Sequence, residues 1–387
     1  MHQSPVDLTG LRGPFREHVL LRDLHMPVLK KSALDAYVKA RFGSAAELVA
    51  YGPIGKETKG ARYKQYGYGA PIRLTFRTGS DKTRQVVLGT MSPGPFGHEH
   101  PADRAQAMLW DYDCYCRLPR HITALDVGAF TARGELMSVA AAKEFFLLTE
   151  WSEGDTYHKD LERLAEASRA TALDRKRTQA LADYLATIHR VKRRDPQLYR
   201  RRLRELLGHG ECIMGLTDSY PHRVGFITED LLQRIEVACN AWRWRLRSQH
   251  ARLSQVHGDF HPWNVLFRRG ADFSVLDRSR GEWGEPADDV TSMSINYLFF
   301  SLCRHGTLKG PLEVLFRSFW DRYLSRSHDQ DVLAATGPFF AFRGLVLASP
   351  LWYPKLTLAL RRKIFRFIEN VLAVPRFDPA DVNRYCD

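Results

Sequence analysis

The distribution of apolar residues changes near Gly154, and this change restricts the fold more than any other feature. Residues 45–150 carry short β-branched or aromatic runs separated by glycine and proline, such as PIRLTFRTG and TRQVVLGTMS. Such runs are typical of an antiparallel meander. After Gly154, apolar residues recur at helical spacing, as at Leu181, Tyr184 and Leu185. The sequence therefore predicts an α+β chain in which a β-rich part precedes a larger, mainly helical part.

The length of 387 residues supports two lobes, because single cores usually stop growing near ~250–300 residues. We expect an N-terminal lobe over 1–150, with a helical extension over 1–44, and a C-terminal lobe over 151–387. A helix over 31–42 is expected to be capped by Ser32 and ended by Gly43. The other expected elements are a helix from Pro101, strands within 124–139 and 144–154, and helices over 228–250, 285–304, 311–326, 331–348 and 357–373.

Several classes of protein are disfavoured by composition. No stretch reaches the ~18 uninterrupted apolar residues of a membrane helix, and the N-terminus lacks the layout of a signal peptide. A cytoplasmic protein with no membrane contact is expected, and its six scattered cysteines fit reduced thiols rather than a zinc site. The net charge of +13 is spread over both halves without a nucleic-acid-binding signature. Nucleic acid is therefore not an expected partner, and the basic stretch 190–211 is interpreted as a solvated helix face rather than an anion contact.

Polar residues of one segment point to chemistry. Residues 256–267 read VHGDFHPWNVLF, and FSVLD follows at 273–277. The apolar runs predict two short paired strands, so Asp259, Asn264 and Asp277 would converge at one strand edge. Three oxygen-bearing side chains suit Mg²⁺ with water and phosphate in its other positions, and a carboxylate beside that metal can take a proton from an attacking hydroxyl. The pattern favours phosphoryl transfer.

The motif H-G-D-x-H-x-x-N, followed by V-L-D and G-E-P-A-D-D-V, resembles the catalytic segment of the aminoglycoside phosphotransferase and choline kinase family. GPIGKETKG, LLTEWSEG and ALADYLATIH match further pieces in order, so the resemblance covers roughly residues 45–300. It implies a bilobal, protein-kinase-like fold: a small antiparallel sheet with one helix in the N-lobe, and a larger helical C-lobe. It also implies that ATP with Mg²⁺ donates its γ-phosphoryl group to the hydroxyl of a small molecule.

The resemblance implies roles for individual residues. Asp259 would orient the acceptor hydroxyl and take its proton, and Asn264 and Asp277 would bind Mg²⁺. His257 and Asp289 would keep the turn in shape, whereas His261 is expected to be structural. The residues implied for nucleotide binding are Gly52, Gly55 and Lys56 of the glycine-bearing turn and Leu148, Glu150 and Trp151 of the connector.

The sequence departs from the family pattern at two places. Kinases of this shape carry a lysine on the third strand, where RQVVLGTMSPG places Gly89 or Thr90. The cations that could replace it are Lys56, Lys59, Lys64 and Arg84. After Asp277, the run DRSRG brings Arg278 and Arg280, which could stabilise the transferring phosphate, recognise an anionic acceptor, or form an exposed ion pair.

Alternative functions remain open at the level of the sequence. A pseudokinase that binds nucleotide or a partner is supported by the missing strand lysine. A protein kinase is disfavoured because no D-F-G or A-P-E run delimits an activation segment. The net basic helical lobe argues against an aminoglycoside acceptor, and amino alcohols, sugars and nucleosides are further candidates. The sequence does not indicate an oligomeric state.

Overall fold

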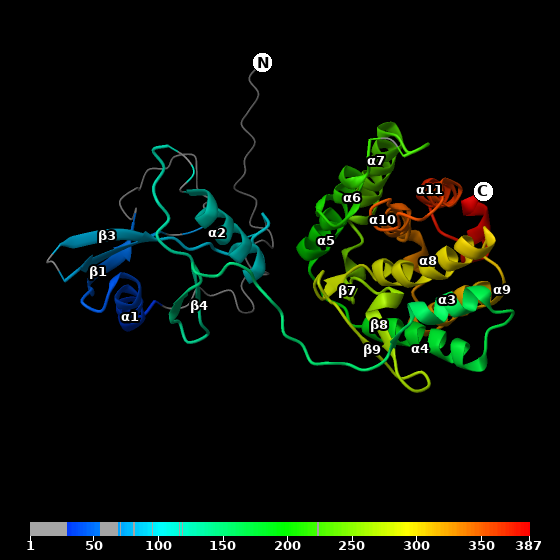
Figure 1. Cartoon of the computed structure of the whole chain (residues 1–387), viewed down its shortest axis with the longest axis horizontal. Coiled ribbons are helices and arrows are strands. Elements are labelled where there is room, and N and C mark those ends of the chain that lie inside the picture. The colour runs from blue at the N-terminus through cyan, green and yellow to red at the C-terminus, as the bar shows by residue number, and fades with distance from the viewer. Residues whose placement is uncertain are drawn as a thin grey trace, which may run out of the picture. The chain divides into compact units, whose positions relative to one another are not determined.

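The computed structural model describes residues 29–54, 69, 71–79, 82–94, 96–115, 117, 119–222 and 224–387. The chain divides into two compact units, Met1–Leu148 and Thr149–Asp387 (Figure 1). The first unit carries small antiparallel sheets and the second is mainly helical, so the predicted α+β class is confirmed. Among the helices of the described ranges, none has the length and apolar character needed to cross a bilayer.

The N-terminal unit is built on a three-stranded antiparallel sheet of order β1-β2-β3 (Glu47–Pro53, Ile72–Arg77 and Thr83–Leu88). Leu74 and Phe76 of β2 are buried while their neighbours along the strand are not, as expected for side chains that alternate between faces. They pack with residues of α1 (Lys31–Phe42) in a small core. The remaining described elements are α2 (Pro101–Tyr115) and a hairpin of β4 (Gly128–Phe130) and β5 (Leu136–Ser138).

Two local predictions for this part of the chain are wrong. Helix α1 starts at Lys31, with Lys30 at the cap and no side-chain cap bond, so Ser32 lies inside the first turn instead of capping it. Gly43 ends the helix as expected, with φ at 107°. The strand expected within 144–154 is not formed, because its main chain pairs with no strand among the described residues before β6 (Asp155–Thr156).

The C-terminal unit contains the long helices that the sequence predicted, the predicted short strand pair within 264–277, and several shorter elements that the sequence did not predict. Its helices are α3 (His158–Glu166), α4 (Ala172–Ile188), α5 (Pro196–Gly208), α6 (Ile213–Ser219), α7 (Glu229–Leu246), α8 (Pro286–His305), α9 (Gly310–Ser327), α10 (Gly337–Ala348) and α11 (Leu358–Ala373). Its short strands are β6, β7 (Ser254–Gln255), β8 (Val265–Phe267), β9 (Phe273–Val275) and β10 (Trp283–Gly284). Helix α10 begins later than expected, because 330–334 forms a separate 3₁₀ turn.

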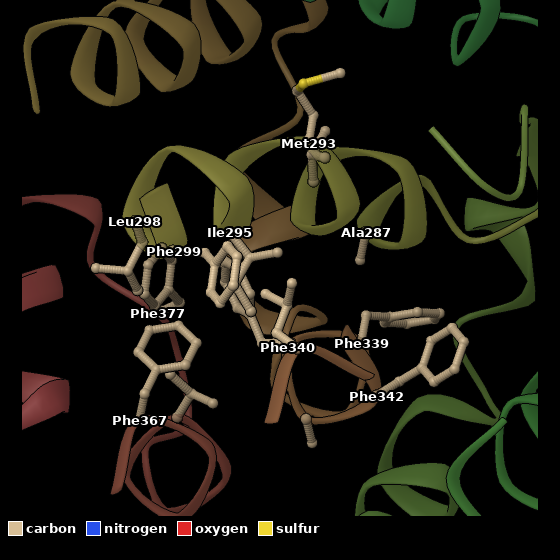
Figure 2. Packing of buried hydrophobic residues seen from close by; sticks show 14 of the residues in the cluster. Ala287, Met293, Ile295, Leu298, Phe299, Phe339, Phe340, Phe342, Phe367 and Phe377 are labelled. Carbon is tan, nitrogen blue, oxygen red and sulfur yellow. The ribbon is translucent and has the colours of Figure 1, made fainter. Parts of the chain in front are cut away.

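Helix α8 lies at the centre of this unit, packed against α3, α9 and α10. Figure 2 shows phenyl rings from α8, α10 and α11 gathered in the same region. The ring of Phe340 lies 5.2 Å from that of Phe367 and 4.7 Å from that of Phe377, centroid to centroid. Each such aromatic side chain buries ~150–250 Å², so these rings join α10 to α11, while most side chains of α8 are themselves buried. Its N-terminal turn carries the GEPADD acids, and these are thereby fixed in space.

Candidate active site

The turn that follows Val256 is held by the first turn of α8. The Asp289 carboxylate is fully buried; its Oδ2 accepts the N–H of His257 and its Oδ1 accepts that of Gly258, both at 2.8 Å. Nε2 of His189 lies 3.0 Å from the same Oδ2, and the other ring nitrogen lies 2.8 Å from the Tyr323 hydroxyl. Burial alone would raise the pKa of Asp289, but the hydrogen bond from His189 and the main-chain donors lower it. A carboxylate so satisfied fixes the turn.

The conformation of the turn also depends on Gly258 and His257. Gly258 has φ at 87°, a region that side-chain-bearing residues rarely adopt, and a Cβ there would lie 3.3 Å from Cβ of Arg280. Burial lowers the pKa of His257, so its ring is neutral at physiological pH. Its Nδ1 can therefore accept the N–H of Asp259, at 3.3 Å. Both residues orient Asp259 through the main chain.

The two carboxylate oxygens of Asp259 face different partners. Oδ1 accepts from Nη1 of Arg343 at 2.5 Å and lies 4.0 Å from Nη1 of Arg280. Oδ2 lies 3.4 Å from Nε2 of His261 and 3.5 Å from Nδ2 of Asn264. Burial would raise the pKa of Asp259, but the hydrogen bond from His261 and the charges of both arginines outweigh it and hold the pKa well below its usual range. The carboxylate is therefore ionised at neutral pH.

Arg343, on α10, connects this carboxylate to α8. Its Nη2 donates to Oδ1 of Asp288 at 2.7 Å and to the Gly258 carbonyl at 3.1 Å, and only 7% of its side chain is exposed. Neither Arg343 nor Asp288 was singled out from the sequence. The available signal was one charged residue in the otherwise apolar run FFAFRGLVL, since a charge placed in a core needs a partner.

Asn264 and Asp277 lie at adjoining ends of the β8–β9 pair. Val265 pairs with Val275, and the N–H of Leu276 donates to the Asn264 carbonyl at 2.9 Å. The Asn264 amide nitrogen donates to the Asp259 carbonyl at 3.0 Å, which leaves its side-chain oxygen available as a ligand. Asp277 is exposed, with φ at 52°. Strained backbone of this kind concentrates at functional sites.

The two arginines that follow Asp277 have different partners. Arg278 donates to the Val256 carbonyl at 2.8 Å and to the Glu282 carbonyl at 3.2 Å, so it supports main chain and has no ion-pair partner among the described residues. Arg280 approaches Asp259 instead. The solvated-face interpretation of 190–211 is wrong for Arg201 and Arg202, whose side chains are largely buried and share Glu205.

The residues predicted to bind nucleotide are described only in part, and those described are mostly exposed. Gly55 and Lys56, with Lys59 and Lys64, lie outside the described residues. Gly52 lies within β1, opposite Arg73. Leu148 and Trp151 are each 88% exposed, and Glu150 is exposed as well. On β3 no lysine is present, and the guanidinium of Arg84 lies over the Phe42 ring at 5.4 Å. The roles of these residues stay predictions.

A match to a known family covers the part of the chain that holds the turn. Residues 123–309 match the family model described as "Phosphotransferase enzyme family". Over these residues, the resemblance to phosphotransferases is confirmed. The matched segment is somewhat less than half of the chain; it includes Asp259, Asn264, Asp277 and Asp289 and ends before Arg343. A search of curated proteins finds no sequence that matches the chain.

Solved structures similar to the chain include three small-molecule kinases. The Plasmodium vivax ethanolamine kinase is 11% identical, with 89% of this chain and 81% of that chain covered and a TM-score of 0.35. The amicoumacin kinase hAmiN is 14% identical, with 83% and 91% covered and a TM-score of 0.39. The aminoglycoside phosphotransferase APH(3'')-Id from Streptomyces rimosus is 15% identical, with 84% and 99% covered and a TM-score of 0.31. These matches are too distant to carry an argument about the site.

Proposed function

We propose that this protein is an ATP- and Mg²⁺-dependent kinase that transfers the γ-phosphoryl group to a hydroxyl of a small molecule. The observation that carries the proposal is the ionised Asp259 carboxylate, held rigidly on a turn beside an available Asn264 oxygen and an exposed Asp277. A fixed carboxylate next to two oxygen ligands is the arrangement that phosphoryl transfer to an alcohol requires.

Asp259 would receive the acceptor hydroxyl as a hydrogen bond and hold it in line with the phosphoryl group. Burial would raise the pKa of Asp259, but the hydrogen bond from His261 and the charges of Arg343 and Arg280 outweigh this effect and hold the pKa well below its usual range. Asp259 is therefore a weak base until the acceptor oxygen begins to bond to phosphorus. Orientation is therefore the larger part of its contribution, with proton acceptance late in the step.

The side chains present fit Mg²⁺. Asn264 and Asp277 offer one amide oxygen and one carboxylate, and magnesium usually takes one or two carboxylates and keeps water and substrate phosphate in its other positions. Within the described residues, no group of three or more His, Cys, Asp or Glu could hold a metal ion. When bound, Mg²⁺ would neutralise charge on the phosphates. Asn264 and Asp277 would hold it beside Asp259.

The N-terminal lobe, residues 1–150, is proposed to bind the nucleotide, and the C-terminal lobe, 151–387, to carry the catalytic turn and the acceptor site. The proposed nucleotide contacts are Gly52, Gly55, Lys56, Leu148, Glu150 and Trp151. A cytoplasmic location agrees with this use of ATP.

The test is an ATP-consumption screen of the purified chain with Mg²⁺ against amino sugars, amino alcohols, sugars, sugar acids and nucleosides. Asp259→Asn should lower kcat at least ~100-fold, the size expected for loss of a positioned base. The matched control is Asp272→Asn, since Asp272 lies in the β8–β9 turn and pairs with Arg268 on the surface. Asp277→Ala should weaken Mg²⁺-dependent nucleotide binding. A protein that binds nucleotide but turns over no acceptor would instead be the pseudokinase that the missing β3 lysine suggests.

A further inference from the structure

Arg343 and Arg280 lie beside Oδ1 of Asp259, and Arg202 lies against Gly281, the residue after Arg280. Arg343 comes from α10, Arg280 from the segment between β9 and β10, and Arg202 from α5. The guanidinium carbon of Arg280 lies 4.8 Å from the centroid of the Phe342 ring, and that of Arg343 lies 4.5 Å from the same centroid. Phe342 is fully buried, so this ring is a fixed support for both guanidinium groups. We call Arg202, Arg280 and Arg343 the arginine cluster.

Arg280 has the most unused hydrogen-bonding capacity of the three, because two of its nitrogens are buried without a partner, compared with one each in Arg202 and Arg343. Its Nε and Nη1 are buried from solvent and have no hydrogen-bond partner among the described residues. Its one ion-pair contact there is Asp259, at 4.0 Å, which is beyond hydrogen-bonding distance. That carboxylate oxygen is already bound by Arg343 at 2.5 Å. Buried donors without a partner are costly, so an anion that accepted from Arg280 would recover this loss.

Gly281, the residue after Arg280, leaves room for the Arg202 guanidinium. Gly281 has φ at 84°, and a Cβ there would come within 3.1 Å of Cζ of Arg202 and closer still to Nη2. Nη1 of Arg202 donates to Glu205 at 2.6 Å, while Nε has no partner among the described residues. Arg278 adds a charge whose donors go to carbonyl groups rather than to a carboxylate. Within the cluster, Arg280 is therefore the arginine that has no carboxylate within hydrogen-bonding distance among the described residues.

The cluster faces the oxygen of Asp259 that the metal side does not use. Oδ2 is directed toward Asn264, whereas Oδ1 is directed toward Arg343 and Arg280. We propose that Arg280, supported by Arg202, binds an anionic group of the acceptor, so that the substrate is a hydroxylated anion. The proposal rests on the proposed kinase function and names its substrate class. A carboxylate or phosphate a few bonds from the reacting hydroxyl could approach the Arg280 guanidinium, whose side chain is 23% exposed, while the hydroxyl reaches Asp259.

This acceptor class agrees with the charge around the turn. A cationic acceptor, such as an aminoglycoside, would place ammonium groups beside Arg280 and Arg343 and would be repelled. Arginine also presents its N–H groups as a planar fork that fits carboxylate and phosphate oxygens. The other anion that could occupy the cluster is the terminal phosphate of the nucleotide. A nucleotide would compete with a bound anion for the cluster in that case, and would not compete if the cluster binds the acceptor.

The test uses the full chain and inorganic phosphate as the probe. Phosphate should raise the unfolding temperature in a saturable way, since a ligand that binds the folded state stabilises it. Arg280→Gln should weaken phosphate binding about 10- to 100-fold, as loss of a charged hydrogen bond implies. Arg280→Lys should keep part of the affinity and shows whether a loss in the Gln variant reflects misfolding. The control is Arg269→Gln, on the exposed β8–β9 turn of the same unit.

The phosphate-binding and acceptor experiments distinguish the possible roles of the cluster. The proposal stands if phosphate still binds with saturating Mg²⁺–AMP-PNP present and if, in the acceptor screen, sugar acids are used better than their neutral and amino counterparts in an Arg280-dependent way. Competition between AMP-PNP and phosphate would assign the cluster to the nucleotide and overturn it. Absence of a phosphate effect, or an equal effect in Arg280→Gln, would also overturn it. If phosphate binds through Arg280 but no acceptor is phosphorylated, the kinase proposal fails and the anion site remains.

Discussion

Replacement of Arg343 by methionine tests whether the charge arrangement around Asp259 has been correctly described. Arg343 makes three hydrogen bonds, of 2.5, 2.7 and 3.1 Å, to Asp259, Asp288 and the Gly258 carbonyl. The side chains of Asp259 and Asp288 are only 14% and 18% exposed. Methionine would fill similar space but leave two nearly buried carboxylates without their shared cation. Breaking a buried pair in this way costs ~3–5 kcal/mol.

The assay is reversible thermal and urea unfolding of the full chain, followed by fluorescence. For a unit of this size, ~1 kcal/mol corresponds to ~2–4 °C, so Arg343→Met should lower Tm by ~6–20 °C. The control is Arg317→Met on α9, whose exposed pair with Glu313 has a separation of 2.8 Å and should be worth less than ~1 kcal/mol. Adding Asp288→Asn to Arg343→Met should restore part of the loss, since one stranded charge is removed. Equal Tm values for Arg343→Met and Arg317→Met would refute the reasoning.

Two further predictions concern pH and packing. The pKa of Asp259 is lower in the folded protein than in the unfolded chain, so the ionised carboxylate stabilises the fold above pH ~3.9, and this stabilisation is lost as the pH falls through the folded-state pKa. The difference in unfolding free energy between the protein and Asp259→Asn, measured by urea unfolding from pH 7 to 3, should therefore become smaller toward pH 3. A difference that stays constant over this range would contradict the assignment. Gly344→Ala should lower the free energy of unfolding by ~1–3 kcal/mol, because a Cβ on α10 would lie 2.7 Å from Cγ1 of Ile368 on α11. The control Gly208→Ala, where a Cβ meets nothing within 4 Å, should be nearly neutral. Similar urea midpoints for the two variants would show that α10 and α11 do not approach this closely.

The site residues that could be predicted are those that lie close together in the sequence. Asp259, Asn264 and Asp277 lie on a turn and a short strand pair, so local spacing alone brings them near one another. Arg343 could not be predicted, because it is 84 residues from Asp259 in sequence. Its position depends on how α10 packs against α8, and side-chain periodicity does not encode that packing.

The fold shows the same division between local and distant information. The long helices α7, α8, α9 and α11 were predicted because periodic apolar residues over several turns are a strong local signal. The short helices α3 and α6 were missed, since two turns offer too few repeats. The expected strand within 144–154 failed for the opposite reason: its residues favour β structure, but a strand also needs a neighbouring strand with which to pair.

Each of the three acids at the start of α8 contacts a partner in a different part of the C-terminal unit. Glu285 binds Arg252, Asp288 binds Arg343, and Asp289 binds the main chain of the catalytic turn. Substitutions at these positions should therefore show strong epistasis, because each acid is adjusted to a partner far away in sequence. Under the proposed role of Arg280, an evolving lineage could change acceptor by altering Arg280 or Arg202 singly, whereas a change at GEPADD or at Arg343 would require compensating changes elsewhere. Arg280 and Arg202 are then the positions at which new specificities can arise most easily.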